Sequence, residues 1–253
     1  MNTVPLDTVV AYVDGLLHVA QFNDPSRGEI NGLLLSADRP VSRVAAAVNT
    51  SFVSIEAASR AGAEFLFVYH QSWASIDLHL KPQKEAALRA RGVSLYGAHA
   101  ALACHPELGT GVTLARLLGL ERVEASFPIG AAFGGVHGFV RGSFEDFTAR
   151  ASRVLGVPVA SWKNSSTFGH VGILTGGAGH TSDVEKARVI GCDTYLTGEG
   201  SMYTQLFARE VAMNLILGTH YATEAPAVKA LAERASHDLG IPWVFVEEHA
   251  DVR

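Results

Sequence analysis

Cysteine is scarce in this sequence, with only Cys104 and Cys192 among its 253 residues. Their spacing matches neither a zinc-binding motif nor a disulfide framework, which excludes a cysteine-rich scaffold. So few cysteines suit a reducing compartment such as the cytoplasm. Because Cys192 lies beside an apolar stretch, we expect it to be a core residue and not a nucleophile.

Runs of basic residues and long apolar runs are also missing. The formal net charge is −5, from 20 Lys and Arg against 25 Asp and Glu. An acidic chain without basic clusters has no electrostatic footprint for nucleic acid or an anionic membrane. No apolar run approaches membrane-spanning length, and the N-terminal stretch lacks a basic start and an apolar signal core. We therefore expect a soluble cytoplasmic protein with no nucleic-acid or membrane partner.

Several catalytic motifs are absent as well. No Gly-x-Ser-x-Gly elbow is present, so a serine hydrolase triad has no anchor. The glycine-rich stretch 175–180 matches neither the P-loop nor the dinucleotide fingerprint. It is either a plain turn or a loop whose backbone N–H groups bind an anion.

The sequence does contain a regular alternation of apolar strands and amphipathic helices. With 48% hydrophobic and 18% charged residues, it is typical of a globular protein with a large core. The pattern predicts an α/β protein made of two alternating α/β halves of similar size with largely parallel sheets, residues 1–125 and 126–253. The expected strands are 31–36, 41–48, 64–69, 93–98, 129–141, 171–174, 193–196, 214–217 and 244–246. The expected helices are 6–20, 51–62, 81–91, 110–118, 144–155, 182–190 with Ser182 and Glu185 as capping box, 202–213 and 225–239.

Histidines follow three of the expected strands. His70 and His99 come directly after strands 64–69 and 93–98, and His220 follows strand 214–217. Glu224 lies four residues after His220, on the same face of a helix that begins near Tyr221. Ligands gather beyond the carboxyl ends of parallel strands, and two imidazoles with one carboxylate match a catalytic zinc or non-haem iron site.

A structural interpretation of the same residues stays open. Each histidine could simply bond a loop carbonyl. Thr219 or Thr223 could cap the helix, and Glu224 could favour its positive end. A separate possibility, a nucleophilic pair of Cys104 and His105, is not supported by their adjacency in the sequence alone.

Four segments of the chain resemble, in the expected order, the NIF-three-like proteins, a family often called GTP cyclohydrolase I type 2 homologues. These segments are residues 44–73, 96–99, 176–199 and 218–224, and their most specific parts are Gly-Ala-Gly…Asp-x-Tyr-Leu-Thr-Gly-Glu and His-Tyr-Ala-Thr-Glu. The resemblance implies two related α/β lobes, a toroidal hexamer, and a pair of divalent metals facing its cavity.

The chain departs from the family pattern at three positions. Gln71 replaces the second of two paired histidines, Ala103 replaces the metal-bridging aspartate, and Tyr203 stands where many members have a histidine. Two neighbouring cations repel each other unless bridging carboxylates offset the repulsion. The sequence therefore predicts one divalent ion (zinc, iron or manganese) or a weakened pair.

The proposed ligands of that ion are His70, His220 and Glu224. The residues that could replace the missing ligands are Gln71, His99, Cys104 and His105. The favoured function is a metal-dependent hydrolase of a small cyclic amide or nucleotide-like substrate, with His99 as catalytic proton donor or acceptor. The alternatives are a non-catalytic hexameric metal-binding or regulatory scaffold with an eroded centre, or a mononuclear reaction of a specialised subgroup. In each case we expect a homo-oligomer.

Overall fold

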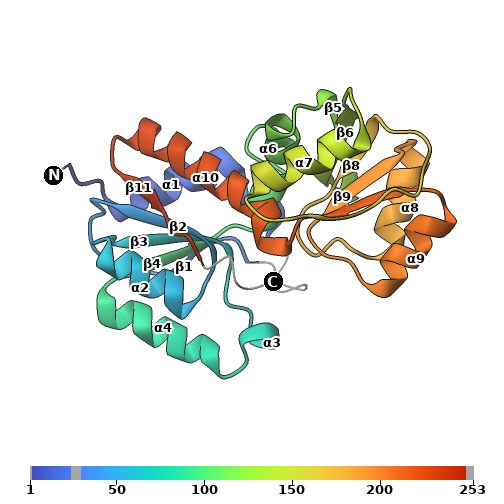
Figure 1. Ribbon diagram of the computed structural model, residues 1–253. Coiled ribbons are helices and arrows are strands. Elements are labelled where there is room, and N and C mark those ends of the chain that lie inside the picture. The colour runs from blue at the N-terminus through green and yellow to red at the C-terminus, as the bar shows by residue number, and fades with distance from the viewer. Residues whose placement is uncertain (1, 24–29, 249–253) are drawn as a thin grey trace. The chain divides into compact units, whose positions relative to one another are not determined.

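The computed structural model describes residues 2–23 and 30–248 (Figure 1). These residues form two compact units. The first unit runs up to Leu102 and resumes at Val228, and the second runs from Ala103 to Ala227. This division differs from the expected boundary between residues 125 and 126. The last strand explains the difference, because β11 (Trp243–Phe245) pairs in parallel with β2 (Val44–Asn49) and extends the sheet of the first unit.

The first unit is built on a five-stranded sheet in the order β1-β4-β3-β2-β11. Strands β4, β3, β2 and β11 run parallel, and β1 is antiparallel to β4. The remaining strands are β1 (Gly32–Leu35), β3 (Phe65–His70) and β4 (Ser94–Gly97). The helices are α1 (Leu6–Leu17), η1 (Val19–Phe22), α2 (Phe52–Arg60), α3 (Ala74–Asp77) and α4 (Leu80–Arg91).

Both faces of this sheet are covered by helices, and successive strand residues point to opposite faces. On one face, Leu66 and Val68 of β3 pack in a core cluster with Ile55 of α2 and Leu88 of α4. Figure 1 shows α2 and α4 side by side on that face. On the other face, Tyr96 of β4 donates its hydroxyl to Asp14 Oδ1 of α1 at 2.5 Å. A continuous apolar strand buried on both faces is what the run 64–69 predicts.

Local sequence signals fix the ends of the helices. Ser51 caps α2, and its hydroxyl accepts from the backbone N–H of Ser54 while Ser54 bonds back to Ser51. Gly92 ends α4 in the left-handed conformation, with φ of 62°. These ends agree with the expected helix boundaries. None of the helices within the described residues has the length and apolarity needed to cross a bilayer.

The second unit contains a six-stranded sheet in the order β5-β6-β8-β9-β10-β7. Strands β8, β9 and β10 run parallel, and β5, β6 and β7 are antiparallel to their neighbours. The strands are β5 (Glu121–Ile129), β6 (Ala132–Phe139), β7 (Ala160–Trp162), β8 (His170–Ile173), β9 (Thr194–Thr197) and β10 (Asn214–Leu217). The helices are α6 (Thr110–Leu117), α7 (Phe144–Leu155), α8 (Thr181–Ile190) and α9 (Met202–Glu210).

Two layers of helices cover this second sheet. Leu114 of α6 and Phe147 of α7 pack on one face, and Val184 of α8 and Ala208 of α9 pack on the other (Figure 1). Two further helices are α5 (Ala100–Ala103) and α10 (His220–Leu239). The chain passes from one unit to the other within each of these helices, after Leu102 and after Ala227. The α/β class is confirmed, with a parallel core in each sheet, one antiparallel edge strand in the first and antiparallel strands at both edges of the second.

Candidate functional site

His70 lies at the carboxyl end of β3, where it pairs in register with Asn49 at the end of β2. Its ring Nδ1 is 2.8 Å from Asn49 Oδ1. An amide oxygen only accepts hydrogen bonds, so His70 donates from Nδ1, and in the neutral ring the lone pair is on Nε2. The sheet therefore holds His70 in the tautomer that can bind a metal through Nε2.

Asn49 is itself held by Glu248, which follows β11 at the same edge of the sheet. The backbone N–H of Asn49 donates to Glu248 Oε2 at 2.8 Å, and its Nδ2 donates to the same oxygen at 3.3 Å. Ser51 Oγ donates to Glu248 Oε1 at 2.8 Å. Burial raises the pKa of the Glu248 carboxyl, and these hydrogen bonds oppose the rise.

His99 stands in an aromatic cluster beside His70. The two imidazole centroids are 5.4 Å apart, and the Tyr69 ring lies 4.8 Å from each of them. Trp73 meets His99 edge to face at 5.6 Å. The backbone N–H of His99 donates to Asn31 Oδ1 at 2.8 Å, which fixes the start of its loop. The structure thus brings together the two strand-end histidines of the first unit.

His220 and Glu224 form the matching cluster of the second unit. His220 Nε2 is 3.3 Å from Glu224 Oε1, and its Nδ1 is 3.0 Å from Glu199 Oε1. Hydrogen bonding to Glu224, reinforced by the charges of both carboxylates, raises the pKa of His220 to about 9. Glu224 is only 3% exposed. Glu199 follows β9, at a strand end like the histidines, and lies outside the predicted ligand set.

The glycine-rich loop after β8 is shaped around this cluster. Gly176 has φ of +70°, and a Cβ at that position would lie 2.2 Å from Glu224 Oε1 and 3.0 Å from His220 Nε2. A Cβ at Gly177 would lie 3.3 Å from His220 Cε1. The loop is therefore more than a plain turn, because it packs its backbone against the imidazole and the carboxylate. This close cradle, together with the nitrogen and oxygen donors inside it, fits a divalent ion.

Both threonines of segment 218–224 have structural roles, and one of them is the helix cap that the alternative interpretation expects. The backbone N–H of Ala222 donates to Thr219 Oγ1 at 3.3 Å, as at a helix cap. Thr223 Oγ1 accepts from the backbone N–H of Gly176 at 3.0 Å, which ties the glycine loop to α10. The cap formed by Thr219 and the bond from the glycine loop to Thr223 thus fix the start of α10, where His220 and Glu224 lie.

Cys104 and Cys192 lack the features of a nucleophile. Burial raises the pKa of the Cys104 thiol to about 11 and that of Cys192 to about 12, and only a thiolate attacks. The backbone N–H groups of Glu107 and Leu108 donate to His105 Nδ1, so a neutral His105 carries its proton on Nε2. Cys192 is 6% exposed, in the core as expected.

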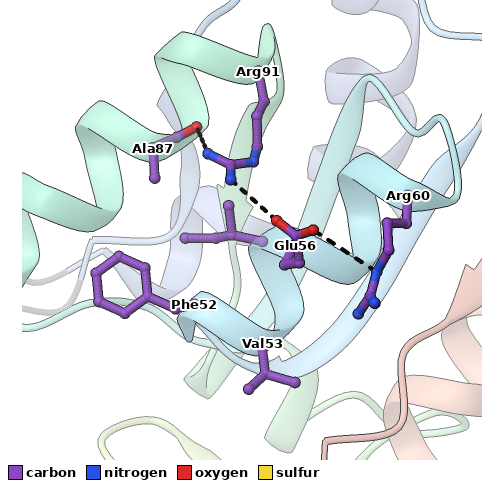
Figure 2. Close-up of a pocket in the computed structure, with 7 residues that line it drawn as sticks. Phe52, Val53, Glu56, Arg60, Ala87 and Arg91 are labelled. Atoms are coloured by element: carbon purple, nitrogen blue, oxygen red, sulfur yellow. Dashed lines mark hydrogen bonds and ion pairs between the residues drawn. The ribbon is translucent and has the colours of Figure 1, made fainter.

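A shallow hollow of about 420 Å³ lies between α2 and α4 of the first unit (Figure 2). Phe52 and Val53 form its apolar wall. Glu56 lies between Arg91 at 3.1 Å and Arg60 at 3.9 Å, so the charges are paired within the hollow. The residues that line it include no histidine, cysteine or hydroxyl nucleophile, and we place the candidate site at the strand ends.

Comparisons with known proteins identify the family and support the fold. The model of the Duf34/NIF3 (NGG1p interacting factor 3) family matches residues 5–251. A Deinococcus radiodurans protein named GTP cyclohydrolase 1 type 2 homolog is 32% identical over 250 residues, which cover 95% of this chain and 92% of that protein. An Allochromatium vinosum protein of the same name is 31% identical and covers 98% of both chains. The crystal structure of TTHA1606 from Thermus thermophilus superposes with a TM-score of 0.83 at 25% identity, covering 98% of this chain and 100% of that one. The chain belongs to the Duf34/NIF3 family.

Proposed function

We propose that this chain is a metal-dependent hydrolase of a small cyclic amide or nucleotide-like substrate, with one divalent ion (zinc, iron or manganese) bound by His70, His220 and Glu224. The observation that carries the proposal is the glycine cradle around His220 and Glu224, which leaves no room for a Cβ at Gly176. Two imidazoles and one carboxylate are a common ligand set for a catalytic ion with an open coordination position.

Such an ion, when bound, lowers the pKa of a bound water and polarises a substrate carbonyl. The chain's own residues prepare their donor atoms for it. Asn49 and Glu199 face the Nδ1 atoms of His70 and His220, so each ring can offer Nε2. Because Glu224 favours the protonated form of His220, that imidazole gives up a proton before it acts as a ligand.

His99 is the proposed proton donor or acceptor for the substrate. Its imidazole lies 5.4 Å from that of His70, centroid to centroid, so it sits beside a proposed ligand. Trp73 and Tyr69 restrict its ring, which favours a defined direction of proton transfer. The names of the relatives support a ring-opening hydrolase class, and we do not extend them to GTP.

The proposal includes the assembly and the compartment. Membership of the family supports a homo-oligomer, and we propose a hexamer. We also propose a cytoplasmic location, in line with the two cysteines of the chain and their unreactive, protonated thiols. We propose neither a nucleic acid nor a membrane as partner, since the net charge is −5.

A metal-binding or regulatory scaffold is the second candidate. It is favoured by Gln71 and Ala103, which stand where the resemblance expects a histidine and a bridging aspartate. Ala103 ends α5, a short helix of Ala and Leu residues without a metal-binding side chain. Under this candidate, the chain assembles and binds an ion weakly without turning over a substrate.

A turnover assay separates the two candidates. Purified protein, loaded with Zn²⁺, Mn²⁺ or Fe²⁺, is tested on a panel of cyclic amides and nucleotides. The hydrolase proposal expects activity that disappears in Glu224→Ala while the oligomer persists. The matched control is His237→Ala, which removes an 86% exposed histidine side chain outside the proposed ligand set. Activity that survives Glu224→Ala, or no activity with any metal, contradicts the hydrolase proposal.

A further inference from the structure

Three polar residues meet at the carboxyl edge of the first unit's sheet. Asn49 ends β2, His70 ends β3, and Glu248 follows β11, a strand nearly 200 positions further along the chain. These strands are parallel neighbours, so their carboxyl ends lie at one edge. Glu248 is only 7% exposed, although its carboxyl is costly to bury. Apolar packing does not offset that cost, so the burial of the Glu248 carboxylate indicates a specific role for its hydrogen bonds.

The direction of each hydrogen bond in this group is determined by chemistry. An ionised carboxylate only accepts, so Glu248 receives bonds from the backbone N–H and the Nδ2 of Asn49. The amide nitrogen of Asn49 therefore faces Glu248, and its Oδ1 faces the imidazole of His70 at 2.8 Å. Ser51, at the start of α2, donates to the other carboxylate oxygen at 2.8 Å and holds Glu248 in place. The hydrogen bonds therefore run from His70 Nδ1, which donates to Asn49, to the Glu248 carboxylate, which accepts from Asn49.

We infer that Asn49 is a positioning residue that keeps the proton of His70 on Nδ1, and that Glu248 sets the orientation of the Asn49 amide. An imidazole in water prefers to carry its single proton on Nε2. That preference would place a hydrogen on the nitrogen that the proposed ion needs. The consequence of this tautomer, that His70 Nε2 binds a divalent ion, rests on the proposed function. The tautomer itself is a property of the metal-free chain.

The side-chain tautomer of His70 can be read directly. In the metal-free full chain labelled with ¹⁵N, long-range ¹H–¹⁵N spectra at mildly alkaline pH distinguish Nδ1–H from Nε2–H rings, and His70→Gln assigns the signal. We expect Nδ1–H in the wild type. Asn49→Leu removes the acceptor and should move the proton to Nε2. Asn49→Asp combined with Glu248→Gln restores an acceptor oxygen without placing two carboxylates side by side, and should return the proton to Nδ1.

Two further variants complete the test. Asn164→Leu makes the same substitution at an asparagine of the second unit, whose Nδ2 bonds Met213 O, and should leave the His70 signal unchanged. Glu248→Gln serves where Asn49→Leu fails to fold, because it removes the charge that orients Asn49 and should give a mixture of tautomers. An Nδ1–H signal that persists in every folded variant of Asn49 and Glu248 overturns the inference.

Zn²⁺ titration of the same proteins gives the second measurement. Loss of the oxygen that accepts the Nδ1 proton of His70 should weaken Zn²⁺ binding by about 10–100-fold in Asn49→Leu and much less in the Asn49→Asp, Glu248→Gln double variant. Unchanged Zn²⁺ affinity in Asn49→Leu with an altered tautomer contradicts the role in metal binding. Failure of the wild type to bind Zn²⁺ contradicts the proposed function instead, and the tautomer result is unaffected by it.

Discussion

Removing the charge of Glu224 should release a proton from His220 in the metal-free protein. Hydrogen bonding to Glu224 is the main cause that raises the pKa of His220 from 6.5 to about 9. At about 1.4 kcal/mol per pKa unit, the shift corresponds to at most about 3.5 kcal/mol. The His220 side chain is 37% exposed, so solvent screening reduces the expected contribution to about 1–2 kcal/mol.

The sign of the effect follows from the raised pKa. The folded chain holds a proton that the unfolded chain releases first, so the stabilisation is complete below pH 6.5 and disappears as pH rises through about 9. In Glu224→Gln we expect the pKa of His220 to fall by more than one unit, since Glu199 alone remains beside it. Between pH 6.5 and 9 the wild type should lose about 1–2 kcal/mol of stability. Glu224→Gln should lose less, because the pKa of its His220 is closer to the value in the unfolded chain.

The assay combines an NMR titration of the His220 Cε1–H signal with urea unfolding at both ends of that pH window. Glu185→Gln is the matched control, because it neutralises an exposed glutamate of the second unit that pairs with Arg188. Zn²⁺ affinity should also fall about tenfold for each unit of pH below 9, since binding displaces the proton. A wild-type His220 that titrates near 6.5, or the same pKa in Glu224→Gln, refutes the reasoning.

Three further predictions follow from single residues. Gly176→Ala should cost about 1–2 kcal/mol of folding free energy from its left-handed backbone, and its Cβ, 2.2 Å from Glu224 Oε1, should also weaken Zn²⁺ binding in a calorimetric titration. Ser51→Ala removes the cap of α2 and should lower the free energy of unfolding in urea by about 1 kcal/mol. Burial, followed by the charge of His170, lowers the pKa of His137, so the protein should lose stability as pH falls below 6.5. His137→Gln should flatten that slope, and equal urea midpoint shifts in both proteins would contradict the assignment.

Much of the order of strands and helices along the chain could be predicted from local sequence patterns. The run at 64–69 is apolar throughout, and β3 occupies Phe65–His70 with five of its six residues buried. Ser51 and Gly92 carry capping chemistry that depends only on neighbouring residues. His70 and His220 were predicted to follow strands for the same reason, because the end of an apolar run can be read directly from the sequence.

Other elements could not be predicted because long-range pairing decides them. Strand β5 is mostly exposed and contains Pro128, so it has no strand pattern of its own, and β6 supplies its hydrogen bonds. The expected capping box of Ser182 and Glu185 was wrong. Helix α8 begins at Thr181, and the backbone N–H of His180 donates to Asp183 Oδ2.

Only the part of the candidate site that depends on local spacing could be predicted from the sequence. His220 and Glu224 share one turn of a helix, and their spacing alone indicates that they meet. Glu248 reaches Asn49 only because β11 returns to the first sheet, which no local pattern reports. The closeness of Gly176 to Glu224 likewise depends on tertiary packing, although a run of glycines was its available signal.

The most direct test of the central claim is the metal content of the chain, measured by elemental analysis on protein purified without chelators or a metal-affinity tag. We expect one tightly bound divalent ion per chain in the wild type and close to none in Glu224→Ala or His70→Ala. Two tightly bound equivalents in the wild type would contradict it. So would a single ion that remains bound after both substitutions.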